Sequence, residues 1–305
     1  MIQYWFRLVT FLLLGVGVFA AAETTVEFKR TLPLSPTDHI VLDVAVPEGS
    51  LNISYARAGE ISVLASARAA DDGGDVPQDF FNSSLTVERA GNTVKVRFTP
   101  NSKYGSRAFR IAYTIGVPYW LEVNSSVENG KQTVSGVMGP VKVACGKGDI
   151  RATYITSTLE ARTGAGNINV IRVGAAAVVE TGSGNINLKD IGPGSTAIVR
   201  KGTGRIEMDG ISGSFTARTD AGELDAKGGI FDAWDLNSIS GNIRIGVPPE
   251  SKYELDAITR SGQLSVENED IDLPQAGQPR ECHQKINGGG KGVRVRSDSG
   301  SIFIQ

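Results

Sequence analysis

Two acidic side chains of this 305-residue chain have the types and spacing that could support catalysis. Glu207 and Asp225 lie 18 residues apart, and each follows a glycine by three positions within a phrase that recurs along the chain. If successive phrases stack as neighbouring strands, the two carboxylates lie ~5 Å apart, the separation that retaining glycosidases use. Arg205 and Arg244 stand close by and would neutralise the pair as an ordinary ladder of surface charges. We therefore predict a protein that is not an enzyme, with polysaccharide degradation as the alternative.

Side chains that bind metal ions are sparse. The chain has two histidines, His39 and His283, and neither has a partner histidine at ligand spacing. His283 lies in the segment ECHQK, which is typical of a solvated loop. The phrase TGSGNINL is similar to a calcium-binding nonapeptide roll, but Asp149 alone supplies the aspartate that such a roll needs. No phosphate-binding GK[ST] pattern occurs either. We predict no metal and no cofactor, with calcium as the alternative.

Asparagines recur at matching positions of two successive phrases and form a candidate polar face. This face consists of Asn167, Asn169, Asn185 and Asn187. It could offer amides to a sugar or to a protein partner. The alternative that we favour is a hydrogen-bonded ladder of asparagines that stabilises the stack. Aromatic platforms for a sugar are few, and the candidates are Tyr119, Trp120 and Phe303.

The phrases that carry these residues define the fold. Their closing glycines are Gly148, Gly166, Gly184, Gly204, Gly222, Gly241, Gly262 and Gly300, at intervals of 18, 18, 20, 18, 19, 21 and 38 residues. Apolar and polar residues alternate on both sides of each glycine, which predicts two short strands joined at a glycine corner. A third apolar row, at Ile155, Val173 and Ile191, suggests a roughly triangular cross-section. Stacking buries the apolar rows in one core, so we predict an all-β fold, a single parallel β-solenoid (β-helix) with coils of 18–21 residues.

The N-terminal third is organised differently. Residues 1–22 combine Arg7 with an apolar run that ends in Ala20-Ala21-Ala22, which predicts a secretory signal peptide; an uncleaved anchor helix is the alternative. The remaining residues 23–305 form one domain. Residues 23–123 form an irregular β cap with the first coils, and residues 124–305 form the regular coils.

Residues 267–292 interrupt the coils and are predicted to form a loop insertion. Loops inserted along one edge of a repeat protein are often its recognition surface. The candidate binding edge consists of Asp270, Arg280, His283, Lys285 and Lys291. An excursion without regular structure is the alternative. Ile302–Ile304 then form the last strand, and its uncovered outer edge predicts end-to-end self-association.

Charge and cysteine content exclude some classes. Loss of Arg7 leaves 30 basic residues against 33 acidic residues, a net charge of −3 that does not favour nucleic-acid binding. Cys145 and Cys282 are too few for a disulfide framework and are too far apart along the predicted stack to bond.

The order of these features resembles the bacterial putative-adhesin family of β-strand-repeat proteins, a domain of unknown function. The likeness lies in the opening EGSLNISY, the segment IAYTIGVPYWLEV, the serial TGSGNINL phrases and the ending GGGKGVRVRSDSGSIFIQ. The resemblance implies an exported solenoid with an adhesive or envelope role.

These features together predict an exported protein that acts by contact in the periplasm or at the cell surface. Its partner is expected to be a protein or glycan of the cell envelope or surface, and the mature chain is expected to have no membrane span. A polysaccharide-binding or polysaccharide-degrading β-helix and a periplasmic structural or regulatory scaffold are the alternatives.

Overall fold

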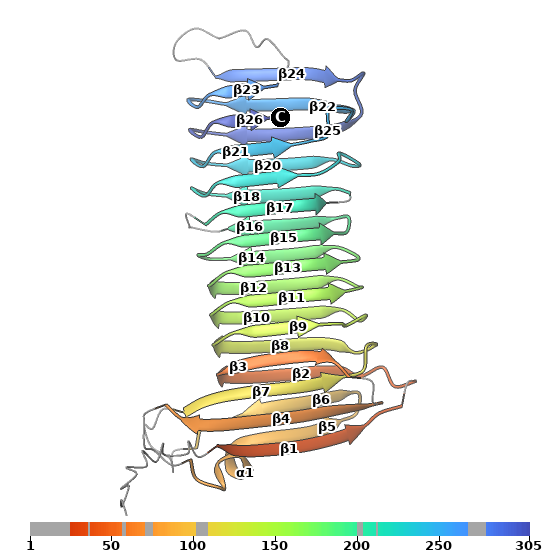
Figure 1. Cartoon of the computed structure of the whole chain (residues 1–305), viewed down its shortest axis with the longest axis vertical. Coiled ribbons are helices and arrows are strands. Elements are labelled where there is room, and N and C mark those ends of the chain that lie inside the picture. The colour runs from red at the N-terminus through yellow and green to blue at the C-terminus, as the bar shows by residue number, and fades with distance from the viewer. Residues whose placement is uncertain are drawn as a thin grey trace, which may run out of the picture.

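The computed structural model describes residues 25–35, 37–56, 59–70, 76–101, 109–199, 204–211, 213–267 and 279–305. The predicted signal peptide and Asp270 lie outside these ranges. Within them, the chain is all-β apart from one short helix and forms two 13-stranded sheets. The strands stack into an elongated column (Figure 1). None of the described helices is long and apolar enough to cross a membrane.

Sheet A has the strand order β1-β4-β7-β3-β9-β11-β13-β15-β17-β19-β21-β26-β23. Its strands are β1 (Val26–Pro33), β4 (Glu60–Ala69), β7 (Phe109–Val117), β3 (Ser50–Tyr55), β9 (Gln132–Ser135), β11 (Ile150–Ile155), β13 (Ile168–Val173), β15 (Ile186–Ile191), β17 (Ile206–Ile211), β19 (Leu224–Lys227), β21 (Ile243–Gly246), β26 (Ile302–Ile304) and β23 (Leu264–Val266). The pairs β1·β4 and β4·β7 are antiparallel, and the other pairs of this sheet are parallel.

Sheet B has the strand order β24-β22-β25-β20-β18-β16-β14-β12-β10-β8-β2-β6-β5. Its strands are β24 (Arg280–Ile286), β22 (Tyr253–Thr259), β25 (Lys291–Ser297), β20 (Trp234–Ser238), β18 (Phe215–Thr219), β16 (Ser195–Val199), β14 (Ala177–Thr181), β12 (Leu159–Ala165), β10 (Val141–Lys147), β8 (Glu122–Asn129), β2 (Val41–Glu48), β6 (Thr93–Phe98) and β5 (Leu85–Ala90). The terminal pairs β22·β24 and β5·β6 are antiparallel. Both sheets are therefore mixed, although the coils between their ends are parallel.

The regular coils have the register that the repeat predicts. Ile168 of β13 pairs with Ile150 on one side and with Ile186 on the other, and all three are buried. Like residues therefore lie above like residues, and each isoleucine contributes ~2 kcal/mol of burial to a continuous core. The third apolar row at Ile155, Val173 and Ile191 is also buried, but it follows a bend at the end of the sheet A strands and forms no third sheet in the described residues.

The glycine corners are fixed by hydrogen bonds between coils. The Thr163 hydroxyl donates to the Gly148 carbonyl at 3.0 Å, and the Thr181 hydroxyl donates to the Gly166 carbonyl at 2.9 Å. Gly166 has a φ of 151°, and a Cβ placed on it would lie 2.1 Å from the carbonyl oxygen of Gly148. Because the corners are in such close contact, only glycine fits at this position.

The N-terminal cap is built from antiparallel pairs and a helix. α1 (Phe80–Ser84) places Phe80 and Phe81 in the core, where the Phe80 ring packs against Phe98 and Phe109. Together with β1, β4, β5, β6 and β7, this helix forms the end of the column opposite β24 (Figure 1). The first coils therefore end on a packed aromatic cluster.

The last two strands of the chain lie inside the stack, which corrects a prediction. β25 lies between β20 and β22, and β26 lies between β21 and β23. The coil of β22 and β23 leaves one level open, and the final residues of the chain fill it. The prediction that Ile302–Ile304 present an uncovered edge is therefore wrong, because both edges of β26 carry strand partners.

The predicted loop insertion at 267–292 also contains regular structure. Residues 280–286 form β24, which pairs antiparallel with the whole of β22 and is the outermost strand of sheet B. Lys291 already belongs to β25. The end of the column is thus formed by β24 and β23, as the upper part of Figure 1 shows.

Candidate binding face at the end of sheet B

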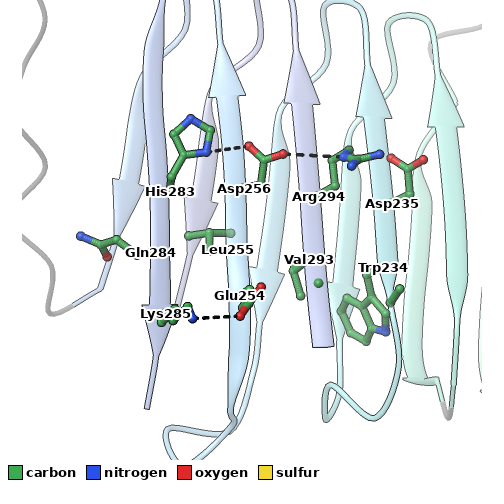
Figure 2. Close-up of a pocket in the computed structure, with 12 residues that line it drawn as sticks. Trp234, Asp235, Glu254, Leu255, Asp256, His283, Gln284, Lys285, Val293 and Arg294 are labelled. Carbon is green, nitrogen blue, oxygen red and sulfur yellow. Dashed lines mark ion pairs between the residues drawn. The ribbon is translucent and has the colours of Figure 1, made fainter. Parts of the chain in front are cut away.

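Three charged residues and a histidine form a row across the outer face of the last strands of sheet B. The register places His283 of β24 beside Asp256 of β22, Asp256 beside Arg294 of β25, and Arg294 beside Asp235 of β20. Figure 2 shows the four side chains in this order. Side chains alternate between the two faces of a strand, so a residue on each side of an inward-facing apolar position must point outward. Because the four strands are neighbours, these outward residues form one row in which the two aspartates alternate with His283 and Arg294.

A hollow of about 520 Å³ opens beside this row. Its lining consists of Ala233, Trp234, Asp235, Glu254, Leu255, Asp256, His283, Gln284, Lys285, Gly292, Val293 and Arg294. Gly292 lies beside Glu254 in the register, and a Cβ placed on it would meet no atom within 4 Å. Gly292 has no side chain and Ala233 has only a methyl group, so the outer face of sheet B is depressed between Glu254 and Arg294. We call this depression the sheet B hollow.

Asp256 is the electrostatic centre of the row. Its carboxylate lies 3.0 Å from His283 Nδ1 and 3.6 Å from Arg294 Nε, and it accepts a hydrogen bond from Arg296. Arg296 also donates to the Asp256 main-chain carbonyl at 2.7 Å. Partial burial alone would raise the pKa of Asp256, but the Arg296 hydrogen bond and the charges of Arg296, His283 and Arg294 together hold that pKa below its ordinary value. Asp256 is therefore ionised across the physiological pH range.

A second row of charges borders the other side of the hollow. Lys285 Nζ lies 3.5 Å from Glu254 Oε1, and Figure 2 shows this pair below the first row. The Lys285 and Glu254 side chains are 73% and 53% exposed, so their ion pair lies in water and contributes little to stability. The walls of the hollow thus carry charges of both signs, and these side chains can change partner at low cost.

The structure separates the residues of the predicted binding edge. His283 and Lys285 line the sheet B hollow. Arg280 begins β24 beside Thr259, and Lys291 pairs with Asp232 at 3.6 Å; neither lines the hollow. Asp270 lies outside the described residues.

Sequence reasoning missed Asp256, Arg294 and Gly292 as members of this site. Each residue occupies an outward position of a regular strand, so the alternation of the sequence could have identified it as outward-facing. Its neighbours on other strands could not be predicted, because the sequence does not show that β25 lies between β20 and β22.

The predicted asparagine face has a structural role for two of its four members. Asn167 Oδ1 accepts the main-chain N–H of Asn185 at 2.9 Å, and Asn185 Oδ1 accepts the main-chain N–H of Arg205 at 2.8 Å. These bonds form the ladder between coils that we favoured. Asn169 is half-buried and Asn187 is exposed, and the two are register partners.

The two carboxylates considered for catalysis are neighbours, as predicted. Glu207 pairs in register with Asp225, but Asp225 is buried and its carboxylate accepts a hydrogen bond from Arg205 at 2.7 Å. Arg244 contacts Glu223. The ion pair with Arg205 occupies the Asp225 carboxylate, so the pair is part of a ladder of charges between coils, as expected from the neighbouring arginines. Among the described residues, no group of three or more His, Cys, Asp or Glu side chains is placed to hold a metal ion.

Comparisons with solved structures find chains that match along most of their length at low sequence identity. A putative lipid binding protein from Parabacteroides distasonis is 13% identical, with a TM-score of 0.48 over 92% of this chain and 97% of that chain. A putative adhesin from Bacteroides fragilis is 11% identical, with a TM-score of 0.45 over 92% and 97% of the two chains. A search of curated proteins finds no match.

The family comparison covers most of the chain. Residues 42–305 match the family described as Toastrack DUF4097, a domain of unknown function. The matched range includes every regular coil, the sheet B hollow and the inserted last coil. The chain therefore belongs to the Toastrack DUF4097 family.

Proposed function

We propose that this chain is an exported, non-enzymatic protein that acts by contact at the cell envelope, in an adhesin-like role, and that the sheet B hollow binds a protein partner. The observation that carries the proposal is the row His283–Asp256–Arg294–Asp235, in which two carboxylates alternate with a histidine and an arginine across four neighbouring strands. Export is supported by the apolar leader-like segment at residues 1–22.

The stack holds this row in place. The strands that carry it are paired along their length, so the main chain beneath the charged side chains is fixed by hydrogen bonds. Their side chains are exposed: Arg294 is 64% and His283 is 58% accessible. A partner meets fixed positions without first ordering a loop, which lowers the entropic cost of association.

The mixture of charges favours a protein over a polyanion as the partner. The hollow and its walls hold acidic residues at Asp235, Glu254 and Asp256 and basic residues at Lys285 and Arg294. A nucleic acid or a polyphosphate would meet the three carboxylates, whereas a protein surface with charges of both signs can pair with each member of the row. A stable protein–protein interface buries ~800 Å² of surface on each partner, so the contact would extend beyond the hollow along the outer face of sheet B.

Charge reversal tests this proposal. Purified Arg294→Glu protein should lose capture of envelope proteins that the wild-type protein captures at low salt, and the same captured bands should weaken as salt rises. Lys142→Glu is the matched control, because Lys142 is an exposed basic residue of the same sheet on β10, several strands away from the hollow. Equal capture by the wild-type and Arg294→Glu proteins would overturn the hollow as the contact site. Hydrolysis of a polysaccharide panel that is lost in Glu207→Gln would overturn the non-enzymatic assignment.

A further inference from the structure

A row of side chains follows one corner of the column, well away from the sheet B hollow. The registers of β3, β9, β11, β13 and β15 align the residues at which these strands bend. In successive coils these residues are Tyr55, Gly136, Tyr154, Arg172 and Asp190. Tyr119 lies beside the first of them, with its ring centroid 6.0 Å from that of Tyr55. We call Tyr55, Tyr119, Tyr154, Arg172 and Asp190 the aromatic corner.

Three members of the aromatic corner adopt a backbone conformation that normally favours glycine. Tyr154, Arg172 and Asp190 have φ values of 58°, 59° and 55°. The neighbouring coils place Gly136 and Gly210 at the same corner position, with φ values of 71° and 67°. The bend therefore suits glycine, and a tyrosine or an arginine there is strained. Strain of this kind, in side chains that add nothing to the core, is typical of binding sites.

The strained residues present their side chains to solvent beside a second hollow. Tyr154 is 57% exposed, and the Arg172 guanidinium lies 5.4 Å from the centre of its ring. Arg172 Nε lies 3.6 Å from Asp190 Oδ2. A hollow of about 310 Å³ lies against these three side chains, and its lining also includes Ile155, Thr156, Val173 and Gly174.

The gap between the tyrosines is enforced by the structure. Tyr55 and Tyr154 are two coil steps apart, which is about 10 Å at the spacing of paired strands. Gly136 lies between them, and a Cβ placed on it would lie 2.9 Å from the Tyr55 Cβ. A side chain at 136 would therefore collide with Tyr55. The two exposed tyrosines, 46% and 57% accessible, are thus separated by a corner position that carries no side chain.

We propose that the aromatic corner binds a neutral, extended polysaccharide chain. Pyranose rings present faces of C–H groups that pack on exposed aromatic rings, and their hydroxyls pair with fixed ionic groups such as Arg172 and Asp190. The separation of Tyr55 and Tyr154 is close to that of alternate rings in an extended β-linked chain. The one basic and the one acidic member pair with each other, so the corner has no surplus charge for a phosphate, a nucleic acid or an anionic lipid surface.

Titration calorimetry of the purified protein with cellohexaose, xylohexaose and chitohexaose tests this proposal. At least one hexasaccharide should bind, and the disaccharide of the same sugar should bind at least tenfold more weakly, because it has no pair of alternate rings and cannot reach both tyrosines. Tyr154→Gly should lower the affinity for the hexasaccharide at least tenfold. Its melting temperature should be unchanged or raised, because glycine relieves the strained φ at this position.

Two controls separate this corner from other surfaces. Phe231→Ala removes an aromatic ring that is 71% exposed elsewhere on the column, and Arg294→Glu alters the sheet B hollow; both variants should keep the wild-type affinity for the hexasaccharide. Two results would overturn the proposal: the absence of binding to all three hexasaccharides, or undiminished binding by Tyr154→Gly. In the first case, binding to phosphatidylglycerol vesicles that Tyr154→Gly abolishes would show that the corner contacts a lipid surface instead.

Discussion

Val293 lies beside Trp234, although Leu255 is the next residue along the chain in the same inward row. Leu255 pairs with the other side of Val293, so the last coil of the chain lies between two coils that precede it. The coil of β22 and β23 must therefore leave one level open until β25 and β26 occupy it.

This insertion predicts an effect of C-terminal truncation. Removal of residues 299–305 deletes β26 and leaves β21 and β23 without the strand that joins them in sheet A. Because Ile302 and Ile304 are buried, the loss of their burial alone costs several kcal/mol. Thermal unfolding followed by circular dichroism should show a melting temperature lowered by ten degrees or more. Removal of Gln305 alone is the control, and an unchanged melting temperature in the longer truncation would contradict the strand order.

A second prediction concerns the inward and outward faces of β15. Ile186→Asp should destabilise the protein by several kcal/mol, because a carboxylate would be buried between Ile168 and Ile206. Asn187→Asp, one residue further on and exposed, should change the free energy of unfolding by less than ~0.5 kcal/mol. Urea titration measures both values. Equal tolerance of the two substitutions would show that the assignment of faces is wrong.

The glycine corners provide a third prediction. Gly166→Ala should lower the free energy of unfolding by more than ~1 kcal/mol, because its Cβ would contact the Gly148 carbonyl oxygen and its φ is 151°. Gly292→Ala is the matched control, since its Cβ would meet no atom within 4 Å. Urea titration of both variants should show destabilisation in Gly166→Ala alone, and a stable Gly166→Ala protein would argue against close contact between the corners.

The asparagine ladder predicts a difference between two neighbouring amides. Asn185→Ala removes the acceptor for the Arg205 N–H and should cost ~1 kcal/mol. Asn187→Ala, on the exposed outer row, should have little effect on stability. Thermal melts of both variants test this difference. If Asn187→Ala were the less stable variant, the ladder would lie in the other row of asparagines.

Asp256 predicts a pH dependence of stability. Its folded-state pKa lies below the ordinary value, so its stabilising contribution is present above about pH 4 and is lost as the pH falls through the folded-state pKa. Asp256→Asn should therefore melt below the wild-type protein at pH 6, and the difference should shrink as the pH falls toward 2. Asp235→Asn is the comparison on the same row. A constant difference in melting temperature from pH 6 to pH 2 would contradict the assignment.

The regular coils could be predicted from the sequence because short stretches of the chain define both their strands and their register. Alternation of apolar and polar residues around Gly166 and Gly184 defines the strands, and equal spacing defines the register, as the pairing of Ile168 with Ile186 shows. The hydroxyl residues at the corners, such as Thr163 and Thr181, also follow from the repeat.

The end of the stack could not be predicted, because strand order is a long-range property. The 38-residue interval between Gly262 and Gly300 indicates that the repeat is interrupted. It does not show that the last coil lies between the two coils that precede it in the sequence. β24 was missed since its inward positions Cys282, Gln284 and Ile286 include a polar residue, which weakens the alternation. The charges of the sheet B hollow meet only through this order.

Crosslinking in living cells tests the central claim most directly. A photoreactive amino acid placed at position 285 lies on the wall of the sheet B hollow, and one at position 142 lies on β10 of the same sheet, several strands away. Irradiation should give a discrete covalent adduct with an envelope protein from position 285, and this adduct should disappear when Arg294→Glu is added. An adduct from position 142 with none from position 285 would contradict the assignment of the contact site.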